Sequence, residues 1–176
     1  MSESIRKHKS EAPERLRFGV FVCSTSRYKQ QQKGERVQDI SGELIESFLK
    51  NAGYEIAFRK LISDDKTVIS NNAVQALDAA DVDVIVFCGG TGITSSDVTI
   101  EIVSPLIDKM LPGFGEVFRR LSFDRVGSGA ILSRAIAGTA GKKAVFCIPG
   151  SPDAVKLCFE RLILTEAAHI VKHARE

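Results

Sequence analysis

Two kinds of hydrophobic pattern alternate along this chain. Short and nearly continuous apolar runs have the length of strands, whereas longer segments repeat apolar residues at helical spacing. The strand-like runs cover residues 17–24, 54–62, 83–88 and 143–148, and the helix-like segments cover residues 40–52, 67–80 and 153 to about 173. Nearly continuous apolar strands are typical of a parallel sheet that is covered on both faces. The pattern therefore predicts an α/β fold, a three-layer α/β/α arrangement with a mostly parallel sheet.

The segment between residues 100 and 139 departs from this alternation. Pro105 and the pair Pro112-Gly113 divide it into short predicted helices. Its apolar residues recur at helical spacing, which is more typical of a core or a subunit interface than of a cofactor site. These residues are Phe114, Val117, Phe118, Leu121 and Phe123. We predict that this segment forms a small inserted subdomain.

Two further local signals concern the end of a helix and a loop. Gly53 follows the predicted helix at residues 40–52 and is a natural residue to end it. Residues 27–36 contain three glutamines, Lys29, Lys33 and Gly34, and no apolar periodicity. They predict a mobile polar loop.

Length, composition and charge limit the possible partners. The chain has 176 residues, of which 44% are hydrophobic and 26% charged, as expected for a globular protein. We predict one domain over residues 17–176, preceded by a basic N-terminal arm over residues 1–16. No apolar run approaches the roughly 18 residues that span a bilayer, and a formal net charge of +2 does not indicate nucleic-acid binding. Neither a membrane nor nucleic acid is therefore expected as a partner.

The cysteines and histidines disfavour two classes of chemistry. No C-x-x-C pair occurs, and we predict that the four cysteines are reduced core residues of a cytoplasmic protein. The histidines, His8, His169 and His173, lie near the termini. No cluster of histidine and cysteine therefore has metal-ligand spacing, and no central histidine can activate a serine or cysteine. Structural zinc and triad hydrolysis are both disfavoured.

The predicted strand at residues 83–88 leads directly into the glycine turn Gly89-Gly90-Thr91-Gly92. Glycine permits positive φ and close backbone approach, and successive N–H groups in such a turn form a concave anion site. A helix start at Asp97 would add the positive end of a helix dipole. The turn lacks the lysine of a Walker loop and the third glycine of a dinucleotide fingerprint. We predict a phosphate site, the alternative being a plain strand-to-helix turn with Asp97 as N-cap.

Polar groups follow all four predicted strands, in residues 24–27, 63–66, 89–97 and 149–153. In an open parallel sheet, ligands bind beyond the carboxyl ends of the strands, so these segments belong to one rim. Mg²⁺ is held by one or two carboxylates plus substrate phosphates, which makes Asp64 and Asp97 the candidate metal ligands. Glu101, four residues after Asp97, would share its helical face and could orient a metal-bound water. The alternative role of each carboxylate is capping or solvation.

Ordered motifs along the chain resemble those of the MoaB/MogA family of molybdenum-cofactor biosynthesis proteins, which includes the G domains of gephyrin-type proteins. The motifs are Asp39-Ile40-Ser41-Gly42, Gly89-Gly90-Thr91-Gly92 with Asp97-Val98-Thr99, Pro112-Gly113-Phe114-Gly115-Glu116, Ser133-Arg134, and Pro149-Gly150-Ser151-Pro152. The resemblance extends from Arg17 to the C-terminal helix. The runs Gly115-Glu116-Val117-Phe118-Arg119 and Ser133-Arg134-Ala135-Ile136-Ala137-Gly138 look more like MoaB than MogA.

The resemblance implies a molybdopterin adenylyltransferase, which moves AMP from Mg-ATP to the terminal phosphate of molybdopterin. Substrates would be ATP and molybdopterin, the cofactor Mg²⁺, and the assembly a homotrimer or homohexamer. Asp64 and Asp97 would be the essential acids, with Glu101 as a further catalytic candidate. The implied substrate-binding residues are Gly89, Gly90, Thr91 and Gly92 together with Pro149, Gly150 and Ser151 for the phosphates, and Ser24 and Ser133 for the pterin side.

One departure from the family pattern keeps other functions open. Many relatives have Thr-Pro-Arg-Asp where this chain has Thr94-Ser95-Ser96-Asp97, so a rigid proline and a cation beside the phosphates are missing. A second hypothesis is therefore a molybdopterin-binding or carrier protein without adenylyltransferase turnover. A third, a generic nucleotide-binding regulator, fits the glycine turn but not the other motifs.

Overall fold

The computed structural model describes residue 13 and residues 15–176, so the predicted basic arm lies almost entirely outside the described residues. The described chain folds around one sheet of six strands in the order β2-β1-β3-β6-β5-β4. The strands are β1 (Arg17–Cys23), β2 (Glu55–Ile62), β3 (Val84–Cys88), β4 (Lys109–Met110), β5 (Ile136–Ala140) and β6 (Lys143–Ile148). The pairs β1–β2, β1–β3 and β3–β6 are parallel, whereas β5 and β4 add an antiparallel edge. The prediction of a mostly parallel sheet is confirmed.

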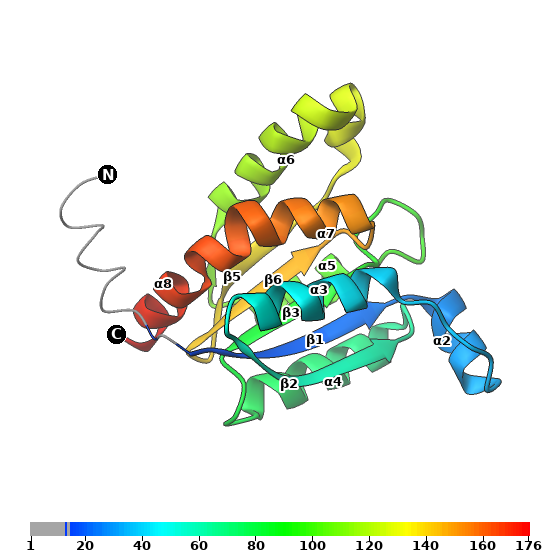
Figure 1. Cartoon of the computed structure of the whole chain (residues 1–176), viewed down its shortest axis with the longest axis horizontal. Helices are drawn as coiled ribbons and strands as arrows, with labels where there is room; N and C mark the ends of the chain where they lie inside the picture. Colours follow the sequence, from blue (N-terminus) through cyan, green and yellow to red (C-terminus); the bar gives the residue numbers. More distant parts are fainter. Residues whose placement is uncertain (1–12, 14) are drawn as a thin grey trace.

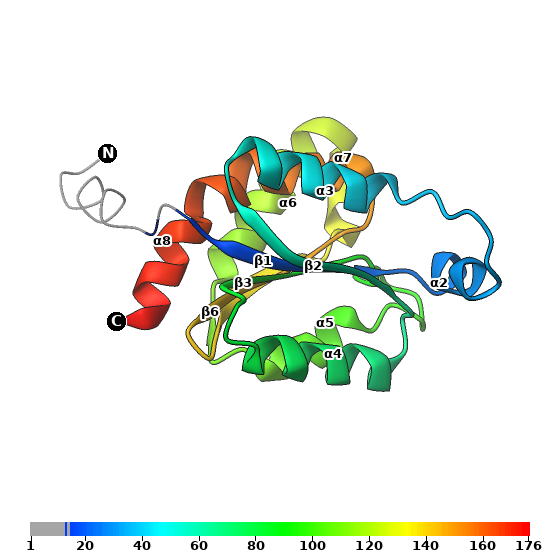
Figure 2. The same ribbon diagram turned by 60° about the horizontal axis from the view of Figure 1, so that its bottom comes forward.

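Helices cover both faces of this sheet (Figure 1 and Figure 2). The longer helices are α2 (Thr25–Gln32), α3 (Ile40–Asn51), α4 (Lys66–Asp78), α6 (Pro112–Val126), α7 (Pro152–Cys158) and α8 (Leu164–Arg175). Shorter elements are α5 (Thr99–Val103), the 3-10 helices η1 (Ser104–Leu106) and η2 (Gly127–Leu132), and the π-helical turn η3 (Phe159–Ile163) between α7 and α8. Helices α3, α6, α7 and α8 pack on one face and α4 and α5 on the other, which gives the predicted three layers.

The core follows the alternation of side chains along the central strands. In β1, Phe18, Val20 and Val22 join the cluster under α3 and α8, whereas Phe21 and Cys23 join the cluster under α4. Successive strand residues point to opposite faces, so a strand that is covered on both sides is apolar throughout. This geometry explains why the strand-like runs are almost continuous in apolar residues.

Three expectations about local structure have clear outcomes. Gly53 has φ 77° directly after the end of α3, which confirms its predicted role in ending that helix. The predicted mobile loop at residues 27–36 is wrong for most of its length, because α2 covers Thr25–Gln32. This helix buries none of its residues and stands away from the sheet in Figure 1. It therefore needs no apolar face, and a polar segment without apolar periodicity was interpreted as a loop.

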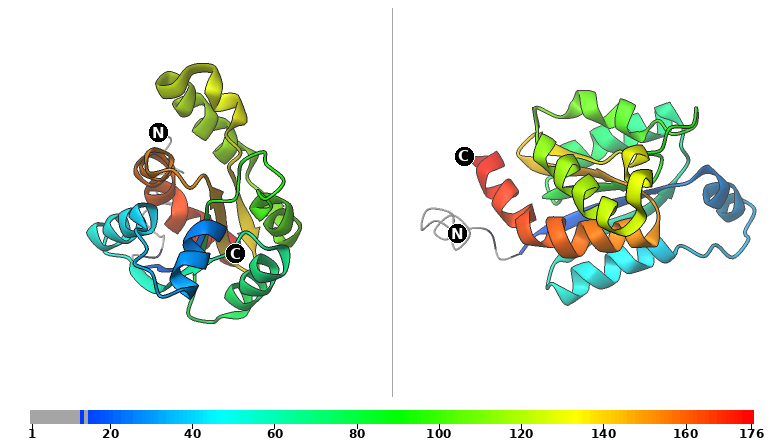
Figure 3. Two further views of the ribbon diagram at one scale, coloured as in Figure 1. Left: turned by 90° about the vertical axis from the view of Figure 1, so that its right-hand side faces the viewer. Right: turned by 90° about the horizontal axis from the view of Figure 1, so that it is seen from above.

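The segment at residues 100–139 contains more than short helices. Pro112 occupies the first turn of α6, where it starts the helix instead of breaking it. Helix α6 and η2 project beyond the α7 layer (Figure 3). The strands β4 and β5 also fall in this segment and were not predicted. Strand β4 has only two residues, and three of the five residues of β5 are alanine or glycine, which are depleted in strands.

Within the described part of the chain, no helix is both long and apolar enough to cross a membrane. The four cysteines, Cys23, Cys88, Cys147 and Cys158, are buried and free, as the sequence predicted.

The packing of the antiparallel strands β4 and β5 can be tested at Gly138. A Cβ atom there would lie 2.3 Å from Cγ2 of Ile107 and 2.6 Å from the backbone oxygen of Lys109. We expect Gly138→Ala to lower the free energy of unfolding by about 1–3 kcal/mol in chemical denaturation, because the backbone must move. The matched control is Gly113→Ala in α6, whose new Cβ meets no atom within 4 Å. The control should be neutral or stabilising by up to about 1 kcal/mol; equal losses in both variants would contradict the packing argument.

Candidate active site

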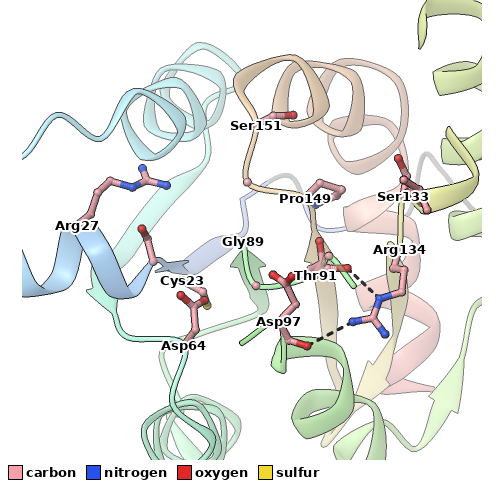
Figure 4. A pocket seen from close by; sticks show the side chains of 15 residues that line it. Cys23, Arg27, Asp64, Gly89, Thr91, Asp97, Ser133, Arg134, Pro149 and Ser151 are labelled. Carbon is pink, nitrogen blue, oxygen red and sulfur yellow. Dashed lines mark hydrogen bonds between the residues drawn. The ribbon is translucent and has the colours of Figure 1, made fainter. Parts of the chain in front are cut away.

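A cavity of about 430 Å³ opens at the carboxyl ends of the parallel strands (Figure 4). Ligand sites of open α/β sheets lie at this edge. The lining residues come from the loops after β1, β2, β3 and β6 and from the segment before β5: Cys23, Ser24, Arg27, Asp64, Gly89, Gly90, Thr91, Gly92, Asp97, Leu132, Ser133, Arg134, Pro149, Gly150 and Ser151. Every site residue predicted from the sequence, except Glu101, lines this one cavity.

The turn after β3 requires glycine for two independent reasons. Gly89 has φ 108° and Gly90 φ 60°, which side chains rarely permit. A Cβ on Gly89 would lie 2.3 Å from the backbone oxygen of Cys23, and a Cβ on Gly90 would lie 2.4 Å from Oγ1 of Thr99 and 2.7 Å from Oδ1 of Asp64. The backbone of the turn is therefore held directly against the ends of β1 and of the loop after β2.

Asp64 is held by one of its two carboxylate oxygens. Oδ2 accepts hydrogen bonds from the backbone N–H of Thr25 at 2.7 Å and from its hydroxyl at 3.0 Å. Oδ1 is buried, and no described group donates a hydrogen bond to it. A buried oxygen without a donor in a native site calls for a missing partner. Because Mg²⁺ prefers carboxylate oxygens, Oδ1 fits the metal that the resemblance implies.

Asp97 occupies a different position from the one predicted. It is not the N-cap of the next helix, because α5 begins at Thr99 and Val98 stands at the cap. Its Oδ2 instead accepts hydrogen bonds from the hydroxyl of Thr94 at 2.6 Å and from the Thr94 N–H at 2.9 Å. The hydroxyl of Thr94 is the largest influence that lowers the pKa of Asp97. The carboxylate is therefore ionised at neutral pH and closes the turn that precedes α5.

The expectation that Glu101 shares a helical face with Asp97 is wrong, since Asp97 lies outside α5. Glu101 is not among the residues that line the cavity. Its carboxylate binds Arg134 through two hydrogen bonds, Nη1 to Oε1 at 2.5 Å and Nη2 to Oε2 at 3.3 Å. The hydrogen bond from Arg134 is the main cause of the lowered pKa of Glu101. Glu101 thus holds an arginine in place.

Arg134 braces the glycine turn from the neighbouring edge of the sheet. Its Nε donates to the backbone oxygen of Thr91 at 3.0 Å, and its Nη2 donates to the backbone oxygen of Asp97 at 3.5 Å (Figure 4). Together with the two bonds to Glu101, these contacts engage most of the guanidinium group, which has five N–H groups. Arg134 fixes both ends of the turn and places a positive charge beside it.

Ser96 stands where many relatives have a cation, but two other arginines lie at the cavity. Arg27 and Arg134 both line the cavity. Arg27 is oriented by Asp39, whose Oδ1 lies 2.8 Å from its Nη1. Neither arginine was predicted as a site residue, although each follows a predicted serine, Ser24 or Ser133, within three positions. Proximity to a predicted rim residue was the signal that could have found them.

Two other lining residues, Cys23 and Leu132, were not predicted either. Cys23 ends β1, and burial raises the pKa of its thiol to about 12. The thiol therefore stays protonated at neutral pH and does not supply a thiolate nucleophile. Leu132 is 58% exposed at the end of η2 and is an apolar side chain that lines the cavity.

A parallel sheet with a glycine turn, two carboxylates and two arginines at its carboxyl edge is typical of a domain that binds a phosphorylated ligand. The family model described as "Probable molybdopterin binding domain" matches residues 19–169. The chain belongs to the MoaB family of molybdenum cofactor biosynthesis proteins.

Relatives at similar identity cover nearly the whole chain. Molybdenum cofactor biosynthesis protein B of Bacillus cereus is 44% identical over 168 residues, 95% of each chain. Molybdopterin adenylyltransferase of Pyrococcus furiosus is 44% identical over 176 residues, which cover 98% of this chain and 99% of the relative. A crystal structure of molybdenum cofactor biosynthesis protein B matches with a TM-score of 0.83 at 42% identity, over 94% of this chain and 99% of that chain. The tungsten cofactor synthesizing protein MoaB from Pyrococcus furiosus gives 0.81 at 43% identity, over 94% and 100%.

The ion pair between Arg134 and Glu101 can be tested through the titration of Glu101. In Arg134→Met, we expect the pKa of Glu101 to rise toward its ordinary value of 4.5, as measured by NMR titration of the side-chain carbons. A lowered pKa in the folded state stabilises the fold above that ordinary value, and the contribution is lost as the pH falls through the lowered pKa. The variant should therefore lose less stability between neutral and acidic pH than the wild type.

The matched control for this titration is Arg120→Met. Arg120 pairs with Asp124 at 3.0 Å on the exposed side of α6. Its loss should leave the pKa of Glu101 at the wild-type value. An unchanged Glu101 pKa in Arg134→Met would show that the ion pair does not form in solution.

Proposed function

We propose that the chain is a molybdopterin adenylyltransferase, which moves AMP from ATP to the terminal phosphate of molybdopterin and releases pyrophosphate. The observation that carries the proposal is the convergence of the glycine turn, Asp64 and Asp97 on one cavity. The relative from Pyrococcus furiosus that bears this activity in its name is 44% identical over nearly its full length, which supports the same chemistry here.

The cavity suits a reaction whose nucleophile is already ionised. A phosphate monoester has a second pKa near ~6, so the attacking oxygen needs no base at neutral pH. No histidine is among the lining residues that the structure describes, and the thiol of Cys23 is protonated. What the reaction does need is alignment of two anions and neutralisation of their charge. Backbone N–H groups of the turn and the guanidinium of Arg27 can provide both.

Asp64 and Asp97 are the residues that would hold Mg²⁺. Oδ1 of Asp64 is buried and has no hydrogen-bond donor among the described residues, and Asp97 is anionic at neutral pH. Mg²⁺ held by such carboxylates would neutralise negative charge on the phosphates of the substrates. The chain holds both carboxylates against the glycine turn, since a Cβ on Gly90 would lie 2.7 Å from Oδ1 of Asp64 and a Cβ on Gly92 would lie 2.7 Å from Oδ2 of Asp97.

We assign the second anion to the turn after β6, for two structural reasons. The hydroxyl of Ser41 donates to the backbone oxygen of Gly150 at 2.7 Å, and the hydroxyl of Ser151 accepts from the N–H of Ala154 at the start of α7. A Cβ on Gly150 would lie 3.1 Å from Cα of Gly89, so the two turns pack against each other. We assign the glycine turn to the nucleotide, and Ser24, Ser133 and the Pro149–Ser151 turn to the pterin phosphate.

The reduced state of all four cysteines fits a cytoplasmic location, where thiols are kept reduced. We therefore place the reaction in the cytoplasm, as the sequence predicted.

Replacement of Asp97 tests the metal role. We expect Asp97→Asn to slow AMP transfer from labelled ATP to purified molybdopterin by about a hundred- to a thousandfold, or about 3–4 kcal/mol, the cost of losing one preorganised transition-state group. Asparagine retains an oxygen that can accept the hydrogen bonds of Thr94, so fold and molybdopterin affinity should change little. The control Asp124→Asn removes an exposed carboxylate on α6 and should keep the wild-type rate.

Two outcomes would overturn parts of the proposal. A residue that holds the catalytic metal must stabilise the transition state. If Asp97→Asn keeps the wild-type rate within about threefold, Asp97 does not do so and is not a metal ligand. If the wild type binds molybdopterin but never transfers AMP, the carrier function replaces the enzyme. The sequence Ser95-Ser96, where many relatives have proline and arginine, is the observation that favours this second function.

We also propose that the protein is a homotrimer or a homohexamer. Of the apolar set predicted for an interface, Phe118 is buried and Phe114 and Leu121 pack on the core, but Val117 and Phe123 are exposed. They continue into further exposed residues on α6 and η2: Val126 at 63%, Ile131 at 77% and Leu132 at 58%. Exposed apolar residues that gather on two adjoining elements in this way are typical of a protein interface.

Light scattering tests the assembly. The wild type should have the mass of three or six chains, and the double variant Phe123→Glu/Val126→Glu should be a monomer, because two charges would be buried without partners. The control Val74→Glu changes a residue of α4 that is 44% exposed on the opposite face of the sheet, and should keep the wild-type mass. A wild-type monomer at micromolar concentration would overturn the proposal.

A further inference from the structure

Arg27 turns its side chain from α2 back toward the candidate active site. Helix α2 buries none of its residues and stands away from the sheet, yet the side chain of Arg27 is 25% exposed and lines the cavity. Figure 4 shows this side chain extending from the helix toward the interior of the pocket. A specific contact, and not the packing of α2, must therefore hold the guanidinium in place.

Asp39 supplies this contact. Its Oδ1 accepts a hydrogen bond from Nη1 of Arg27 at 2.8 Å, and its Oδ2 lies 3.3 Å from Nη1 of Arg59. The carboxylate is itself fixed, because it caps α3 by accepting a hydrogen bond from the N–H of Gly42 at 3.1 Å. A side chain at position 42 would overlap with this carboxylate. The glycine of the motif at residues 39–42 thus gives Asp39 the space in which it binds Arg27.

The two arginines of the cavity differ in how many N–H groups remain for a ligand. Arg134 donates hydrogen bonds to the glycine turn and to Glu101, so its guanidinium is largely used by the fold. Among the described residues, only Asp39 accepts a hydrogen bond from the guanidinium of Arg27, a group with five N–H donors. A guanidinium can bind a phosphate through two parallel hydrogen bonds. Of these two arginines, Arg27 is therefore the one that can bind an anionic substrate.

The first turn of α3 links Arg27 to the turn after β6. The residue that caps this helix holds Arg27, and two residues later the hydroxyl of Ser41 donates to the backbone oxygen of Gly150 at 2.7 Å. Both Arg27 and Gly150 line the cavity, and so does Ser24 at the N-cap of α2. Arg27 thus belongs structurally with Ser24 and the turn after β6, the groups to which we assigned the pterin phosphate.

We propose that Arg27 binds the terminal phosphate of molybdopterin, and that Asp39 is the positioning residue that directs Arg27 toward it. This inference rests on the assignment of that phosphate in the function proposed above. A phosphate monoester has a charge of about −1.5 to −2 at pH 7. Because Asp39 divides its negative charge between Arg27 and Arg59, the guanidinium of Arg27 keeps its attraction for such an anion.

The affinities for molybdopterin and for its dephosphorylated form, measured under anaerobic conditions, test the role of Arg27. We expect Arg27→Gln to raise the Kd of molybdopterin by about ten- to a hundredfold, as for a lost hydrogen bond to a charged group. The Kd of the dephosphorylated pterin and the Kd of Mg-ATP should both stay at the wild-type value. Arg27→Lys keeps the charge but not the planar fork, so its Kd for molybdopterin should be intermediate.

The variant Asp39→Asn tests the positioning role. Asparagine caps a helix about as well as aspartate, so the fold should persist while the ion pair with Arg27 is lost. We expect the Kd of molybdopterin to rise by about three- to tenfold, the effect of one lost hydrogen bond. The Kd of the dephosphorylated pterin should not change. Because Asp39 acts through Arg27, adding Asp39→Asn to Arg27→Gln should cause no further increase.

The matched control is Lys29→Gln, which removes another positive charge from α2 at a residue that does not line the cavity. It should keep the wild-type Kd for molybdopterin. A wild-type Kd in Arg27→Gln, equal weakening of both pterin forms, a change confined to Mg-ATP, or an equal loss of affinity in Lys29→Gln would each overturn the proposal. These are binding measurements, so they remain decisive if the protein never transfers AMP, and failure of the proposed enzyme is distinguishable from failure of this inference. Far-UV circular dichroism verifies that each variant is folded.

Discussion

The close approach of the glycine turn to the end of β1 is the constraint on which the site depends. Cα of Gly89 lies so near the backbone oxygen of Cys23 that any side chain would overlap with it, and the N–H of Gly89 donates to the oxygen of Ile148 at 3.0 Å. The turn is thus fixed by β1 on one side and by β6 on the other. Parallel pairing brings three loops to one edge, and the absence of a Cβ lets their backbones meet.

Sequence reasoning predicted the central sheet and most of the cavity because both follow from short-range patterns. A short run that is apolar throughout, such as Val84–Cys88, is typical of a strand covered on both faces, and its parallel neighbours then bring the post-strand loops together. Helix α2 and strands β4 and β5 lack such a signal. Helix α2 is polar throughout, and β5 is recognisable only from its pairing with β6. Their structure depends on tertiary contacts that no local window contains.

The contrast between local patterns and tertiary contacts also explains which predictions about the site were wrong. The position of Asp97 after a glycine turn suggested a helix cap, but its carboxylate binds Thr94 and the helix begins two residues later. The role of Arg134 depends on contacts 33 and 43 residues away, with Glu101 and Thr91. Only the placement of β5 beside β6 brings this arginine to the turn. A positive charge beside the turn thus comes from another part of the chain, although the loop itself has Ser96 where many relatives have arginine.

The titration behaviour of the lining residues fits a site that acts by fixed charge. The hydrogen bond from Thr94 lowers the pKa of Asp97, and burial raises the pKa of Cys23 to about 12. Both groups therefore keep one protonation state across the neutral range, and neither is poised to transfer a proton, which requires a pKa near the working pH. If AMP transfer occurs here, its pH dependence near neutrality should come from the attacking phosphate, whose second pKa is near ~6. An enzyme of this kind needs rigid placement of charges more than an acid or a base, and the backbone contacts of Gly89 together with the hydrogen bonds of Arg134 provide that rigidity.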